Sequence, residues 1–112
     1  MSNYLFQVAY TPEAWASLLA HPHDRIDAVR PVIEKLGGKI VHAWFAFGDY
    51  DVVAIAEMPT NVEAAAFSLA ATAGGAIKAL KTTPLMTTAE GIEAMKKAGQ
   101  SGYKAPTRRA HA

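Results

Sequence analysis

His42, Trp44 and Asp51 are the residues of this sequence whose types and spacing most readily suggest chemistry. A neutral imidazole beside a carboxylate is a workable acid–base pair at neutral pH, and an indole can stack on a planar ligand. On one strand-hairpin face, His42 would act as a general base, Asp51 would orient it, and Trp44 would hold an apolar substrate. The same side chains also suit an oligomer interface with a hydrogen-bonded histidine, because aromatic and ionic residues serve interfaces too.

A hairpin over residues 37–58 is the element that must position these side chains. Its two apolar runs flank Gly48 and Asp49, and a Gly-Asp pair in that setting predicts a two-residue turn in which Phe47 faces Tyr50. One face of the hairpin is then uniformly apolar. Since side chains alternate along a strand, the opposite face carries Ile40, His42, Trp44 and Ala46 from the first strand and Asp51, Val53, Ile55 and Glu57 from the second.

The second face mixes apolar walls with ionisable groups, which suits a lined pocket better than a core. The residues expected to bind a small apolar or aromatic ligand there are Trp44, Ile40, Val53, Ile55 and Glu57. His42 and Asp51 are the candidate catalytic pair. Asp51 also has a structural alternative, because a carboxylate just after a tight turn can accept backbone N–H bonds.

Composition narrows the classes of protein. A chain of 112 residues fits one domain, and a formal net charge of +1 with 19% charged residues indicates neither a nucleic-acid-binding surface nor an acidic tail. The absence of cysteine excludes disulfides, thiolate metal sites and cysteine nucleophiles. Residues 1–10 lack the features of a signal peptide, and no apolar run reaches the length of a membrane span. We therefore expect a cytoplasmic protein with no cofactor and no nucleic-acid or membrane partner.

His21 and His23 form a His-x-His pair that could ligate a metal if further ligands converged on it. The remaining histidines are His42 and His111, and nothing in the sequence indicates such convergence. The pair lies beside an expected helix end, where surface or dipole-stabilised histidines are the simpler interpretation. We expect no metal site.

The order of elements predicts an α+β fold. The sequence indicates strand 3–10, helices 13–20 and 25–36, hairpin 37–58, helix 62–73, strand 78–87 and a terminal helix that ends at Gly99. A hairpin between two helical crossovers is typical of a ferredoxin-like βαββαβ sandwich with an antiparallel four-stranded sheet, here with an added C-terminal helix. We expect one domain over residues 1–99 and a basic, disordered tail over residues 100–112.

Two prolines predict local departures from regular structure. Pro31 predicts a kink or a new start inside the second helix, and Pro84 predicts that the last strand is an edge or carries a bulge. Ile92 and Met95 are expected to face inward from the terminal helix. A bare sheet face, together with a helix over residues 62–73 that has one charged residue, predicts at least a dimer.

Four segments carry a resemblance to a known family: residues 35–39 (KLGGK), 47–53 (FGDYDVV), 57–59 (EMP) and 81–85 (KTTPL). The chain resembles the GYD domain family, named for a Gly-Tyr-Asp signature, from about Tyr4 to Met95. The signature residues here are Gly48, Tyr50 and Asp51, in a Gly-Asp-Tyr-Asp context. The family is grouped with the dimeric α/β-barrel proteins, so the resemblance implies a ferredoxin-like monomer that pairs sheet to sheet. It implies no particular activity.

Three functions follow from these observations. The first is an oligomeric small-molecule-binding protein, such as a sensor or carrier, with a pocket on the open sheet face. The second is a cofactor-independent enzyme of the oxygenase, isomerase or decarboxylase type, which the resemblance allows and in which His42 and Asp51 would act. The third is a structural or regulatory oligomer without a ligand. Whether His42 and Asp51 line a closed cavity or a filled interface separates these alternatives.

Overall fold

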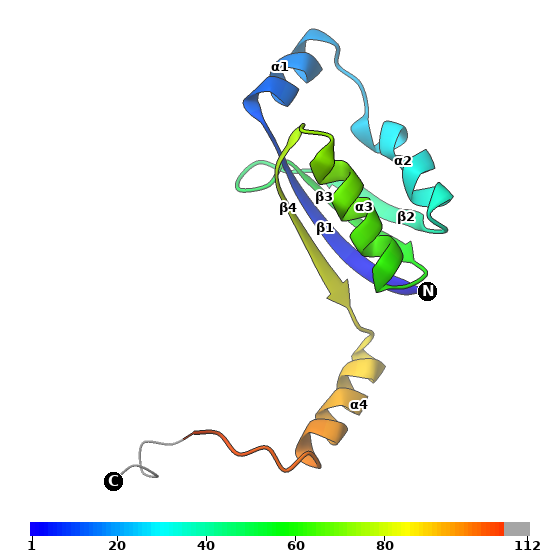
Figure 1. Cartoon of the computed structure of the whole chain (residues 1–112), viewed down its shortest axis with the longest axis vertical. Coiled ribbons are helices and arrows are strands. Elements are labelled where there is room, and N and C mark those ends of the chain that lie inside the picture. The colour runs from blue at the N-terminus through cyan, green and yellow to red at the C-terminus, as the bar shows by residue number, and fades with distance from the viewer. Residues whose placement is uncertain (107–112) are drawn as a thin grey trace.

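The computed structural model describes residues 1–106 and contains a four-stranded antiparallel sheet in the order β2-β3-β1-β4. The strands are β1 (Ser2–Tyr10), β2 (Lys39–Phe45), β3 (Val52–Met58) and β4 (Ile77–Leu85), and the helices are α1 (Pro12–Ala20), α2 (Arg25–Lys35), α3 (Asn61–Ala73) and α4 (Thr88–Gly99). Figure 1 shows α2 and α3 beside the sheet and α1 at one end of it. The predicted ferredoxin-like α+β architecture is confirmed, and Pro84 lies on an edge strand as predicted.

Each helix begins at a short polar residue whose side chain accepts a backbone N–H of the first turn. These residues are Thr11 for α1, Asp24 for α2, Thr60 for α3 and Thr87 for α4. Such caps satisfy donors that the first turn would otherwise leave unpaired. The helix α2 passes through Pro31 without ending, so of the two alternatives predicted for this residue, a kink or a new helix start, the structure excludes the new start.

The core lies between the sheet and the helices α2 and α3. Phe6 of β1 meets Phe67 of α3 edge to face, with 5.3 Å between ring centroids. Ile33 of α2 and Met58 of β3 are fully buried beside them. Alternate residues of β3 are buried from Val52 onward, which assigns the even-numbered face of this strand to the helices.

The β2–β3 hairpin keeps the predicted register close to its loop. Phe45 pairs with Val52, as a two-residue turn would also require. The connection is longer than predicted, however, because residues 46–51 all lie outside the strands. Phe47 is fully exposed at the tip of this loop, and the predicted Phe47–Tyr50 strand pair is wrong.

A β-bulge at Val41 changes the register at the far end of the hairpin. Ile40 pairs with Ala56, and the next pair along the ladder is His42 with Ile55. Because Val41 has no partner, the side chains of β2 that precede it lie on the opposite face of the sheet from the one that a regular alternation would give them. Ile40 is consequently buried in the core at 7% exposure. The prediction that Ile40 shares the face of His42 is wrong.

The helix α4 stands away from the sheet, beyond the end of β4 (Figure 1). Ile92 is 53% exposed and Met95 is 72% exposed. The prediction that these residues face inward is wrong, because the chain leaves β4 in a direction that carries α4 past the sheet. Within residues 1–106, no helix is both long and apolar enough to cross a membrane. Arg108, Arg109 and His111 of the predicted tail lie outside the described residues.

Gly38 lies where the chain passes from α2 into β2, pressed against the end of β3. A Cβ atom on this residue would lie 2.5 Å from the Met58 sulfur and 2.6 Å from the Glu57 carbonyl oxygen. The second contact is with backbone, which cannot move aside as a flexible side chain can. The fold therefore requires a residue without a side chain at this position.

We expect Gly38→Ala to lower the free energy of unfolding by about 1–3 kcal/mol, since it overpacks the core against a fixed carbonyl. Gly91→Ala on α4 is the control, because a Cβ there meets nothing within 4 Å. Urea denaturation of both variants measures the difference. Equal stability of the Gly38 variant and the wild type would contradict the close approach.

Candidate functional site

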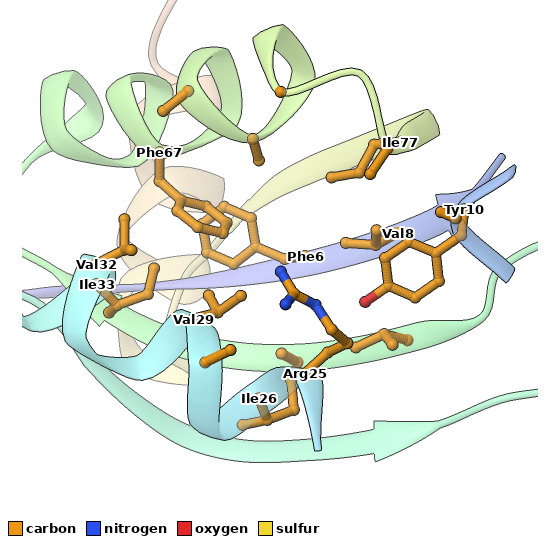
Figure 2. Close-up of a pocket in the computed structure, with 18 of the residues that line it drawn as sticks. Phe6, Val8, Tyr10, Arg25, Ile26, Val29, Val32, Ile33, Phe67 and Ile77 are labelled. Carbon is orange, nitrogen blue, oxygen red and sulfur yellow. The ribbon is translucent and has the colours of Figure 1, made fainter. Parts of the chain in front are cut away.

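A cleft of about 560 Å³ lies between the helix-covered face of the sheet and the helices α1, α2 and α3 (Figure 2). Phe6, Val8 and Val52 contribute to its sheet side, Val29 to its α2 side and Phe67 to its α3 side. A volume of this size and a mainly apolar lining are typical of sites for small molecules. The cleft lies on the opposite face of the sheet from the pocket that the sequence predicts.

The cleft exists because small side chains line its interior. Ala54 and Ala56 lie on its β3 side, and Ala70 and Ala71 lie on its α3 side. Alanine cannot fill the space between a sheet and two helices, so the layers meet at Phe6 and Phe67 and leave a gap beside them. The alanine-rich composition of residues 62–73 is the sequence signal that could have indicated this cleft.

The polar groups of the cleft gather near the start of α2. Arg25 is the first residue of α2, and its Nη1 lies 3.3 Å from Nε2 of His23. Figure 2 shows the Arg25 guanidinium and the Tyr10 hydroxyl directed into the same space. Burial raises the pKa of Tyr10 above its ordinary value, and the nearby Arg25 charge opposes the shift. No aspartate or glutamate occurs among the described residues that line the cleft.

Asp51 connects three separate parts of the chain. Its Oδ2 accepts hydrogen bonds from the backbone nitrogen of Tyr10 at 2.9 Å and from Nε1 of Trp15 at 3.2 Å. Its own backbone nitrogen donates to the carbonyl oxygen of Val8 at 2.7 Å. The structural role predicted for this carboxylate is confirmed, with the difference that the backbone donor belongs to β1 and not to the turn.

The structure does not bring Asp51 and His42 together. His42 pairs across the ladder with Ile55, and Asp51 lies four positions before Ile55 in the chain, a span of about 13 Å in extended backbone. The His42 ring instead stacks on Trp44 with 5.6 Å between ring centroids. The predicted acid–base pair is therefore not formed, because the carboxylate is held at the end of β1.

The open face of the sheet carries the other predicted site residues. Val53, Ile55 and Glu57 are partly buried and lie on the same face as His42 and Trp44, as predicted. A smaller hollow of about 250 Å³ touches His42 and Trp44 at the outer edge of β2, but none of the three β3 residues lines it. Within the single chain, this hollow brings together Ile40, His42 and Trp44, but the predicted binding residues as a whole do not enclose a common pocket.

Comparison with protein families identifies the chain. The model of the GYD domain matches residues 4–100. The chain belongs to the GYD domain family. The match covers the sheet, the cleft and α4. Neither the comparison with curated proteins nor that with solved structures found a match.

The signature of this GYD domain lies in the β2–β3 loop. Gly48 has a φ of +152° there, a conformation that favours glycine. Asp51 ends the signature, and its carboxylate holds Tyr10 and Trp15. The aspartate of the motif therefore has a structural role beside the cleft, because its hydrogen bonds fix the corner between β1 and α1.

The contacts of His23 in this GYD domain are with His21 and with Arg25, the first residue of α2. Nδ1 of His23 lies 2.9 Å from the carbonyl oxygen of His21. No three histidine, aspartate or glutamate side chains within residues 1–106 converge in a way that could hold a metal ion. The role open to His23 is that of a polar residue at the end of the cleft.

We expect Asp51→Ala to lower the free energy of unfolding by about 1–3 kcal/mol, because it leaves the Tyr10 N–H and the Trp15 indole N–H without their acceptor. Asp49→Ala in the same loop is the control, since this exposed residue should change stability by less than about 0.5 kcal/mol. Thermal denaturation followed by circular dichroism measures both. Two variants of equal stability would contradict the connecting role of Asp51.

Proposed function

We propose that this GYD protein binds a small, mainly apolar molecule in the cleft between its sheet and its helices, as a sensor or carrier would. The observation that carries the proposal is the cleft itself, about 560 Å³ bordered by Phe6, Val29 and Phe67 in the centre of the fold. Protein interiors are normally packed as densely as organic crystals, so a gap of this size beside the core suits a ligand. Polar groups gathered at one end supply orientation.

The proposed binding site lies on the helix-covered face of the sheet, whereas the sequence predicted one on the open face. The enzyme alternative has less support, because it requires Asp51 beside His42. The carboxylate that was to orient the imidazole is engaged with Tyr10 and Trp15. Ligand binding requires no such pair, and the cleft does not depend on His42.

We further propose that the open sheet face pairs with a second copy of the chain. Leu5, Val53 and Ile55 place apolar side chains on this face, and Trp44 beside them is 54% exposed. The apolar residues of α4 are likewise exposed in the single chain. Association with a second copy would remove apolar surface from water on both features.

We expect Ala54→Leu to weaken ligand binding at least about tenfold while leaving the melting temperature unchanged or higher, because the added carbons fill the cleft. The measurement is the fluorescence titration of Nile red, a neutral apolar dye, into each protein. Ala16→Leu on the exposed side of α1 is the control. No saturable binding by the wild type, or undiminished binding by Ala54→Leu, would contradict the proposed site.

We expect the wild type to have twice the mass of the single chain in light scattering coupled to size-exclusion chromatography. Ile55→Lys should convert it to a monomer with its fold intact, because it places a charge in the middle of the open face. Val62→Lys, at an exposed position on α3, should leave the dimer unchanged. A monomeric wild type at micromolar concentration would refute the sheet-to-sheet pairing.

A further inference from the structure

The positive charge of Arg25 faces the apolar cleft without a carboxylate on the lining. Its Nη1 lies 3.3 Å from Nε2 of His23, and this ring supplies no negative charge. Asp24 precedes Arg25, but its Oδ1 caps α2 through the backbone nitrogen of Ile26 at 2.8 Å. Asp51 lies near Tyr10 and is held by two donors. The cleft thus has a cationic end and an apolar remainder.

Tyr10 adds a neutral donor at the same end. The ring packs edge to face against Trp15, with 5.6 Å between centroids and 89° between planes. The backbone nitrogen of Tyr10 is fixed by Asp51. A tyrosine hydroxyl is protonated at neutral pH and can donate a hydrogen bond, and burial raises the pKa of this one further. Its position is therefore set before a ligand arrives.

We infer that the cleft binds a hydrophobic monocarboxylate, with the carboxylate between Arg25 and Tyr10 and the apolar body along Val29 and Phe67. The inference rests on the proposed function and adds the class of ligand. A guanidinium matches the two oxygens of a carboxylate with parallel N–H donors, and the phenol supplies another. Those donors suit a monoanion on a long apolar chain. The chain then occupies the space that Ala54 and Ala70 leave open.

Isothermal titration calorimetry with decanoate and decanol tests the inference on the full-length protein, below the micelle concentration of decanoate and within the aqueous solubility of decanol. The two ligands share a chain and differ in charge. The wild type should bind decanoate at least about tenfold more tightly than decanol. Arg25→Met replaces the guanidinium with an apolar side chain. This variant should lose the preference for decanoate while binding decanol as tightly as the wild type does. Arg30→Met, at an exposed α2 position outside the cleft lining, should keep the preference.

The outcomes test the class of ligand separately from the claim that the cleft binds a ligand at all. Equal binding of the two compounds by the wild type, or an undiminished preference in Arg25→Met, overturns the carboxylate inference and leaves cleft binding intact. If the wild type binds Nile red but binds neither decanoate nor decanol, the carboxylate inference is overturned too. Failure of all three compounds to bind overturns the proposed function as well. If circular dichroism shows that Arg25→Met is unfolded, Tyr10→Phe replaces it and must lower decanoate affinity alone.

Discussion

A single carboxylate oxygen, Oδ2 of Asp51, sets the geometry on which the cleft depends. It receives the backbone N–H of Tyr10 and the indole N–H of Trp15, so the end of β1, the start of α1 and the hairpin loop meet at one acceptor. A hydrogen bond to a charged acceptor is stronger than one between neutral groups. The corner fixes Tyr10, and Tyr10 forms part of the polar end of the cleft. The family signature and the candidate site are thus joined by one interaction.

The two faces of the sheet are suited to different tasks. The helix-covered face combines two large aromatic rings, Phe6 and Phe67, with alanines too small to close the space around them. The open face carries Val53, Ile55 and Trp44 without an enclosed cavity of their own. The proposed ligand binding therefore uses the first face, and the proposed association uses the second. A dimer formed through the open face would leave the cleft accessible.

The features that sequence reasoning predicted correctly depend on local signals. The predicted helices 13–20 and 25–36 and the terminal helix form because their starts depend on contacts within one turn, which the structure shows at Thr11, at Asp24 and in the Thr87–Glu90 capping box. The order of strands follows from hydrophobic alternation and from the hairpin. The bulge at Val41 was not predictable in this way, because the residue that stays unpaired is chosen by packing across the sheet. One such residue moved Ile40 from the predicted site into the core.

The candidate site depends on distances between segments far apart in the sequence, which local patterns do not contain. Methyl resonances test its location most directly: ¹³C-labelled Val and Ile side chains are followed by NMR while decanoate is titrated into the full-length protein. The account predicts progressive shifts for Val29 and Ile77, which line the cleft, and none for Val53 and Ile55 on the open face. Shifts confined to Val53 and Ile55 would contradict it and would return the binding site to the open sheet face.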